Sequence, residues 1–226
     1  MKLLREQRWD DHRFYHQCRI NQSLHLLSAL SFLVAYALLF VDPAAAGLLG
    51  WGVSMVSRQA GHFFFEPRGY DRVNDVSFQY KEDVKVGYNL RRKVVLMGIW
   101  VAVPVLLALS PSLFGLIEPA GETGLLVSGY WHDVGIFWLA LGAGGLLFRT
   151  VHLFFLQGPL AGLCWMSKIL TDPVHDVMLY WKSPFYLLRG QRQPGAGSVG
   201  QLVSCPATAC GCLPERVGSS QRLSTA

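Results

Sequence analysis

The sequence predicts an all-α protein, a polytopic membrane helical bundle that crosses the bilayer about four times with both termini on the cytosolic side. Of its 226 residues, 51% are hydrophobic and only 15% are charged, whereas a typical soluble domain has about 25% charged residues. Long apolar stretches alternate with loops that are either rich in lysine and arginine or free of them. This alternation indicates successive crossings of a membrane.

The first two predicted spans differ in polarity. The first has no charge and ends at Asp42-Pro43, a natural helix stop. The second is apolar in its first half and then contains Arg58, Gln59 and His62. We interpret it as a span with functional polar groups or as a half-buried hairpin arm. The predicted spans are 24–41, 44–65, 94–117 and 134–156.

The third and fourth spans contain helix-disturbing residues that membranes tolerate. Pro104 lies in the third span, where neighbouring helices can satisfy the carbonyl that it frees. Gly142, Gly144 and Gly145 lie in the fourth span. Small residues allow helices to approach closely, so we expect these glycines to form a packing face.

The remainder divides into an interfacial segment and a tail. Residues 159–189 are predicted to be interfacial, because 160–170 is apolar but too short to cross. Thr171-Asp172-Pro173 has the residues of a capped helix start, and His175 is expected on the polar face of that helix, with a role as a ligand as the alternative. From Gln191 the composition shifts to Gly, Ser, Pro, Thr and Cys. We therefore predict a membrane domain over 1–190 and a disordered tail over 191–226.

The distribution of lysine and arginine sets the orientation. Taken together they are frequent in 1–23, mostly as arginine, and in 66–93, and they return after the fourth span. The turn at 42–43 and the loop 118–133 contain neither. Cytosolic loops are enriched in these residues, so the chain is expected to be N-in and C-in. The pattern fits a bacterial inner membrane and the endoplasmic reticulum membrane equally.

Other classes are disfavoured. The net charge of +5 is not concentrated in one basic stripe with interleaved aromatics, so no nucleic-acid partner is expected. The five cysteines are an odd number and lack the paired spacing of a zinc site. The polar segment before residue 24 is too long for a cleaved signal peptide.

Six of the seven histidines gather on one predicted side of the membrane. His132 alone falls on the opposite side, so we exclude it from any shared site. Imidazole is a common ligand for iron, zinc and copper, and this gathering predicts a histidine-rich metal site. The alternative is a set of amphipathic histidines lining the interface. The histidines on the cytosolic side are His12, His16, His25, His62, His152 and His175.

Helical spacing indicates which side chains cooperate. Gln59, His62 and Glu66 share one face, so Glu66 is expected either to bind the metal or to fix the tautomer of His62. His16 and His25 are nine residues apart and would lie on opposite faces of a straight helix. The chain must bend between them, and Asn21-Gln22-Ser23 is the expected helix start.

Two arginines accompany candidate ligands. Arg58 precedes His62 by one turn, and Arg149 precedes His152 by three residues. Each is expected either to hold the carboxylate of a lipid-derived acid or to reach the lipid headgroups.

Two motifs carry a family resemblance. Tyr15-His16, Asn21 and His25 match a Tyr-His-x4-Asn-x3-His pattern, and Gly61-His62 with Phe65-Glu66 match Gly-His-x-x-Phe-Glu. Over roughly its first 70 to 120 residues the chain thereby resembles the membrane-bound, iron-dependent 2-hydroxy-fatty-acid dioxygenases of α-oxidation, which act on the acid derived from phytosphingosine. The second half has no counterpart in shorter members of that family.

The resemblance implies an Fe(II) centre that uses O2 to shorten a 2-hydroxy fatty acid by one carbon. His16, His25 and His62 carry over as ligands, with Asn21, Gln59 and Glu66 around them. His152 is added as a fourth candidate on topology alone. His12 and His16 also form an HxxxH, but the HxxHH boxes of di-iron desaturases are absent. A non-catalytic scaffold or lipid-binding protein is the alternative function.

Overall fold

The computed structural model describes residues 2–16, 18–66, 69–70, 74–84, 90–119 and 125–191, and these are helical with connecting turns. The predicted tail lies outside the described residues except for Gln191. The helices are α1 (Lys2–Tyr15), α2 (Arg19–Leu38), α3 (Pro43–Leu49), the π-helix η1 (Gly50–Met55), α4 (Val56–Phe64), α5 (Phe78–Val84), α6 (Leu90–Leu109), α7 (Gly129–Gln157), α8 (Pro159–Tyr180) and α9 (Ser183–Leu188).

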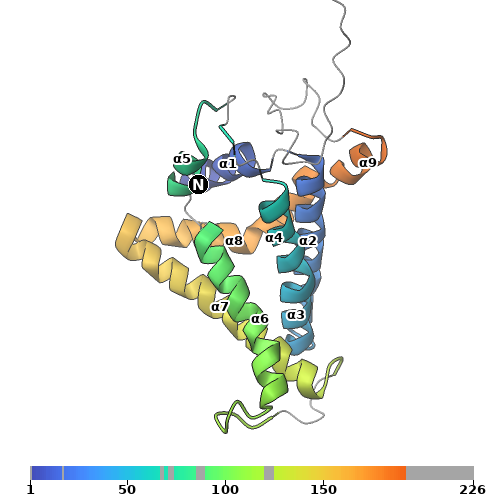
Figure 1. The fold of residues 1–226 in the computed structure, drawn as a ribbon. Coiled ribbons are helices and arrows are strands. Elements are labelled where there is room, and N and C mark those ends of the chain that lie inside the picture. The colour runs from blue at the N-terminus through green and yellow to red at the C-terminus, as the bar shows by residue number, and fades with distance from the viewer. Residues whose placement is uncertain are drawn as a thin grey trace, which may run out of the picture.

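The helices form two layers, and α8 runs across both of them. The consecutive helices α3, η1 and α4 return alongside α2, and α6 lies beside α7 (Figure 1). After α7 the chain reverses at Gly158-Pro159, and α8 runs crosswise back to α2, below α1 (Figure 1). This arrangement brings α1, α2, α4 and α8 together at one end of the bundle.

The contact between α3 and α7 depends on two glycines. A Cβ on Gly47 would lie 2.0 Å from the Gly135 carbonyl oxygen, and one on Gly135 would lie 2.2 Å from the Ala44 carbonyl oxygen. The helices therefore touch through their backbones. The prediction of a Gly142, Gly144 and Gly145 packing face is only partly right, because Gly142 packs on Trp51 while neither Gly144 nor Gly145 has an atom within 4 Å of its Cβ position.

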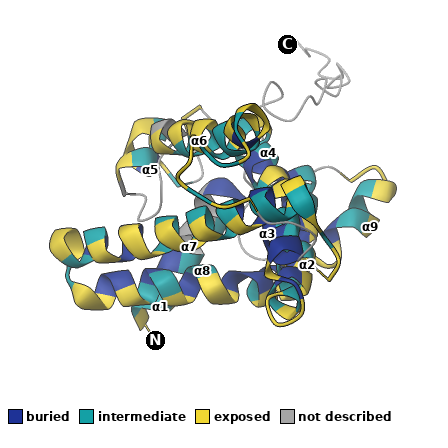
Figure 2. Cartoon of the chain, turned by 90° about the horizontal axis from the view of Figure 1, so that it is seen from below, coloured by how far each residue is buried: buried dark blue, intermediate teal, exposed yellow. Residues whose placement is uncertain are grey.

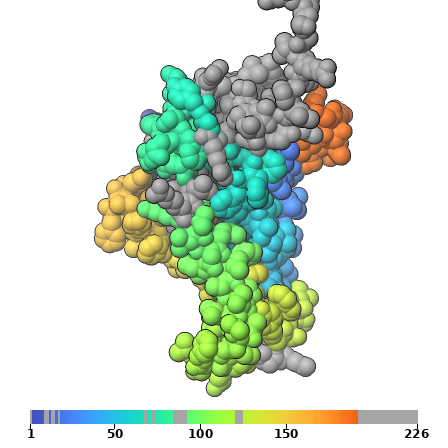
Figure 3. Space-filling view, in the orientation of Figure 1, coloured from blue at the N-terminus to red at the C-terminus, as the bar shows by residue number. Residues whose placement is uncertain are grey.

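Tryptophans form the core between the two layers. The ring of Trp100 on α6 stacks between Trp51 and Trp138, with centroid distances of 6.5 and 5.2 Å. The indole nitrogen of Trp138 also donates to the Trp100 carbonyl oxygen at 3.0 Å. These contacts fix α6, which otherwise stands along the surface of the molecule (Figure 3).

Among the residues that the structure describes, three helices are long and apolar enough to cross a membrane, namely 19–38, 92–109 and 129–157. Only 6% of the window on α6 is buried inside the protein. Exposed apolar residues cover the outer faces of the long helices, as the exposed residues in Figure 2 show. Such a surface suits lipid rather than water. The predicted second span is not among the three, because η1 and the polar end of α4 interrupt its apolar run.

The structure corrects the helix start that we predicted at Thr171-Asp172-Pro173. These residues lie inside α8, which begins instead at Gly158-Pro159. Proline is favoured at the first helical position, and Gly158 adopts a φ of 92° that other residues rarely take. Pro173 is buried within the helix, where it removes one backbone hydrogen bond but not the packing that holds α8 in place.

Candidate metal centre

Three histidines meet where α1, α2 and α4 come together. His16 lies just after α1, His25 is on α2 and His62 is on α4. Each offers one ligand atom, and these three atoms lie within 4.8 Å of one another. The ring centroids of His16 and His25 are 4.0 Å apart, and those of His25 and His62 are 5.0 Å apart. The motifs that carry the family resemblance therefore meet at one point.

The bend that lets His16 face His25 lies between α1 and α2. It falls ahead of Arg19, not at the predicted start at Asn21-Gln22-Ser23, which belongs to the helix itself. Cys18 caps α2 by accepting a hydrogen bond from the backbone of Asn21 at 3.3 Å. The Asn21 side chain donates to the Tyr15 carbonyl oxygen at 2.8 Å and so ties the end of α1 to α2.

Gly61, the residue before His62, lies where α4 approaches α2. A Cβ at this position would lie 2.3 Å from Asn21 Oδ1 and 3.3 Å from His25 Cδ2. Only glycine allows α4 to approach α2 this closely, because any side chain would collide with buried atoms. The closeness of the three imidazoles depends on this contact.

Each imidazole has an outer partner near its Nδ1 atom. His16 Nδ1 is 2.9 Å from the Tyr180 hydroxyl, and His62 Nδ1 is 3.1 Å from Glu66 Oε2. His25 Nδ1 is 3.9 Å from Asp176 Oδ2. Partners of this kind orient metal-binding histidines, which would then coordinate through Nε2. The His62–Glu66 contact is the one that the helical spacing predicts.

Buried nitrogen atoms of this cluster lack hydrogen-bond partners. His16 Nε2 and both ring nitrogens of His25 are buried and accept or donate no hydrogen bond. An unsatisfied buried polar atom costs about 1–3 kcal/mol. A metal ion bound to the Nε2 atoms would remove part of this cost, so the residues fit a metal on structural grounds.

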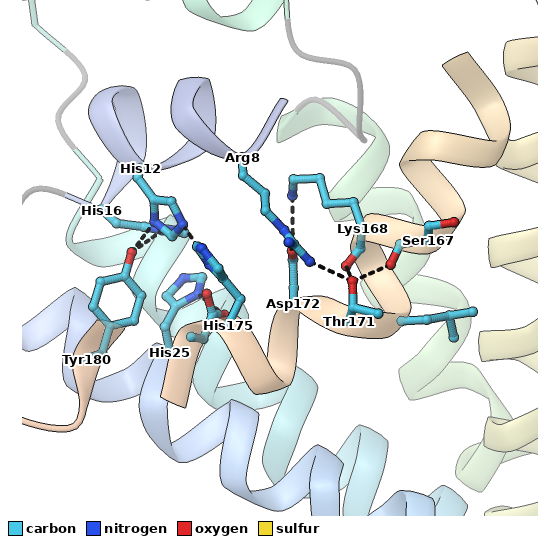
Figure 4. Close-up of polar contacts among 12 residues, drawn as sticks. Arg8, His12, His16, His25, Ser167, Lys168, Thr171, Asp172, His175 and Tyr180 are labelled. Carbon is cyan, nitrogen blue, oxygen red and sulfur yellow. Dashed lines mark hydrogen bonds and ion pairs between the residues drawn. The ribbon is translucent and has the colours of Figure 1, made fainter. Parts of the chain in front are cut away.

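The helix α8 supplies partners that the sequence analysis missed. Lys168, Asp172, Asp176 and Tyr180 recur every four residues and are all buried, so the polar face of α8 points into the protein. This spacing within an apolar helix was the available signal. Figure 4 shows Tyr180 and His175 reaching toward His12 and His16 from α8.

The surroundings of the histidine cluster shift the pKa values of its ionisable groups. Burial, followed by the neighbouring His25 and His12, lowers the pKa of His16 well below its usual value, so the ring is neutral at pH 7. Burial and Arg8 lower the pKa of His175. Burial by itself would raise the pKa of Asp176, but His25 and Arg58 outweigh it and bring the value to about 2. Asp176 is therefore a carboxylate.

A cavity of about 470 Å³ opens beside the histidines. His16 and His62 are among its polar lining residues, and Phe32, Leu39 and Leu139 are among its apolar ones. Its charged lining residues are four cations and two carboxylates, which leaves a net charge of +2 with neutral histidines. These charged residues are Arg8, Arg58, Lys93, Lys168, Asp172 and Asp176. The cavity therefore suits an anionic head with an apolar tail.

The two predicted arginines have different surroundings. Arg58 lines the cavity and forms an ion pair with Asp176 at 2.6 Å, while its buried Nε atom has no hydrogen-bond partner. The buried Gln59 also lines the cavity, and its Oε1 atom has no hydrogen-bond partner. Arg149 and His152 contact each other at 3.1 Å but do not line the cavity.

His152 is therefore not brought together with the three histidines, and it belongs to neither histidine group in the described part of the chain. It stands on α7, two turns before the chain turns into α8. Lying on the same predicted side of the membrane as the three histidines therefore does not place it beside them. His132, which we excluded, lies in the first turn of α7.

Compared with known protein families, curated proteins and solved structures, the chain matches none.

Proposed function

We propose that this protein is a membrane-embedded, Fe(II)-dependent dioxygenase that shortens 2-hydroxy fatty acids by one carbon. The observation that carries the proposal is the meeting of His16, His25 and His62 beside a cavity with a mixed charged and apolar lining. Buried ring nitrogens of His16 and His25 have no hydrogen-bond partner there. The resemblance of the two motifs to the dioxygenase family supplies the metal and the substrate class. The membrane setting suits a lipid substrate.

The three histidines would hold the iron through Nε2. Fe(II) at such a site supplies binding and activation of O2 at open coordination positions. The hydroxyl of Tyr180, the carboxylate of Asp176 and the carboxylate of Glu66 keep the rings turned toward one point. Removing an outer partner of this kind weakens metal binding by about 10- to 100-fold.

Arg58 is the better of the two predicted anchors for the substrate carboxylate. It lies on α4 one turn before His62, and the residue lines the cavity. A guanidinium holds a carboxylate through a fork of N–H donors, and its pairing with Asp176 fixes its orientation. The acyl chain would extend along the apolar lining near Phe32 and Leu139.

The proposed reaction converts a 2-hydroxy acid and O2 to the acid one carbon shorter, CO2 and water. Protein purified in detergent, loaded anaerobically with Fe(II) and exposed to O2 should release the shortened acid, measured by mass spectrometry. His16→Ala, His25→Ala and His62→Ala should each abolish this activity and lower bound iron. His132→Ala is the matched control and should change neither.

Bound iron also separates the enzyme from the alternative, a scaffold or lipid-binding protein with interfacial histidines. Protein that binds no metal after careful reconstitution, and whose His62→Ala variant is no different from His132→Ala, would favour the scaffold. The substrate anchor has a separate signature. Arg58→Lys should retain iron but raise KM, because a lysine loses the bidentate geometry.

We further infer four crossings with cytosolic termini, in a bacterial inner membrane or the endoplasmic reticulum. The run 43–64 is helical throughout and about 33 Å long at 1.5 Å per residue, which is sufficient to cross alongside α2. Single cysteines at the exposed positions Gln79 and Pro111 test this in a cysteine-free background. A label that does not cross membranes should reach Gln79→Cys only from the cytosol and Pro111→Cys only from the other side. Reaction of both from one side would contradict this topology.

A further inference from the structure

A second group of ligands lies beside the three histidines. His12 on α1 and His175 and Asp176 on α8 each offer one ligand atom, and these atoms also lie within 4.8 Å of one another. Figure 4 shows His12 and His175 facing each other, with Tyr180 on the other side of the His12 ring. Five of the seven histidines thus gather at this end of the bundle.

The distances within this group suit a single ion. His12 Nε2 and His175 Nδ1 are 3.3 Å apart. Two donors that each lie about 2.1 Å from one ion, at an angle of about 90–110°, are about 3.0–3.4 Å apart. The Tyr180 hydroxyl contacts His12 Nδ1, which leaves Nε2 of His12 directed at His175.

The kinds of donor also point to a metal. Two histidines and one carboxylate are the ligand set of many non-haem Fe(II) sites with open positions. Asp176 is a suitable carboxylate because Arg58 holds one of its oxygens at 2.6 Å and restricts its rotation. The donors come from α1 and α8, so an ion there would join the two helices.

The two groups adjoin each other. Asp176 Oδ2 is 3.9 Å from His25 Nδ1, and His12 Nδ1 is 3.3 Å from His16 Nδ1. The Tyr180 hydroxyl contacts both His12 and His16. We propose that a second divalent metal ion binds to His12, His175 and Asp176, so that the protein holds a two-metal centre. This inference goes beyond the proposed function. His12 and His175 have no role in that function, and Asp176, which orients His25 there, would here also bind a metal.

A chain of hydrogen bonds from His175 through His12 and Tyr180 to His16 would explain the same contacts without an ion. Metal stoichiometry distinguishes the two. The full chain, purified through a tag that contains no histidine and stripped with a chelator, is dialysed against Fe(II) without oxygen and, in parallel, against Co(II). Bound metal per chain is then measured by mass spectrometry.

Two ions per chain are expected for the unaltered protein, and one for His175→Gln. His62→Gln should also retain one ion, and the matched control His132→Gln should retain two. His12→Gln, which alters α1 instead of α8, tests the same site if His175→Gln does not fold. The folding of each variant is checked by circular dichroism and size-exclusion chromatography.

One ion per chain that is lost in His62→Gln but kept in both His12→Gln and His175→Gln would overturn the second site and leave the first intact. One ion that is lost in His175→Gln but kept in His62→Gln would support the second site and contradict the first. Binding of no metal would overturn both.

Discussion

Gly61→Ala tests the contact on which the histidine cluster depends. The added Cβ would lie 2.3 Å from Asn21 Oδ1, well below the 3.0 Å that real Cβ contacts respect. Asn21 is completely buried, and its amide donates to the Tyr15 carbonyl oxygen, so the side chain cannot swing away. The helices α2 and α4 must therefore separate by at least about 0.7 Å.

The expected loss of stability is moderate, while the loss of metal is larger. Overpacking of this kind costs about 1–3 kcal/mol, and alanine regains about 0.5–1 kcal/mol over glycine within a helix. The net loss is about 0–2.5 kcal/mol, and for a chain of this size each kcal/mol corresponds to about 2–4 °C in Tm, so we expect a fall of up to roughly 10 °C. Ligand positions must hold within about 0.5 Å, so metal affinity should fall at least about tenfold.

Gly144→Ala is the matched control, because the same change on α7 meets no atom within 4 Å. Its Tm should be unchanged or slightly raised, and its metal content should equal that of the unaltered protein. Thermal unfolding in detergent and equilibrium dialysis against Fe(II) measure the two effects. A Gly61→Ala protein with the Tm and the metal affinity of Gly144→Ala would refute the close contact of α2 and α4.

Glu66→Gln keeps a hydrogen-bonding group near His62 but removes the negative charge. Metal affinity measured by dialysis should therefore fall by up to about tenfold, while Tm stays unchanged. An unchanged metal affinity would show that Glu66 is not part of the site. Cys18→Ser should leave Tm unchanged because serine is a better N-cap, whereas Cys18→Val should lower stability by about 1 kcal/mol, and equal melting of both would argue against the cap. Trp138→Phe removes the donor to the Trp100 carbonyl and should lower the free energy of unfolding by about 1 kcal/mol. The loss should be seen as a lower Tm and as faster proteolysis around α6. Wild-type behaviour in both assays would show that other contacts hold α6.

Local spacing predicted the parts of the site that lie within one helix. The i, i+4 spacing predicts the His62–Glu66 contact, which forms although Glu66 lies just beyond the end of α4 at Phe64. The bend before His25 was placed too late, because Cys18 is not among the usual capping residues. Its thiol acts as a cap here because Asn21 is tied to Tyr15.

Local spacing on α8 marks a polar face but does not tell in which direction that face points. An inward polar face and an outward one have the same pattern, and only the position of α1 and α2 against α8 tells them apart. Asp172-Pro173 resembles a helix start, so one continuous helix was divided into two pieces. His152 was included because it shares a predicted membrane side, but a shared side does not fix the lateral position within the bundle.

The late position of α8 in the chain has a consequence for biogenesis. Arg58 and its partner Asp176 are separated by 118 residues, which a ribosome takes roughly 6–24 s to add at about 5–20 residues per second. During that interval the nascent chain carries the guanidinium of Arg58 without its partner Asp176. It also carries the imidazoles of His16, His25 and His62. Because α8 is made last, this end of the protein can be completed only when α8 arrives, and binding of the proposed metal is expected only after translation has passed Tyr180.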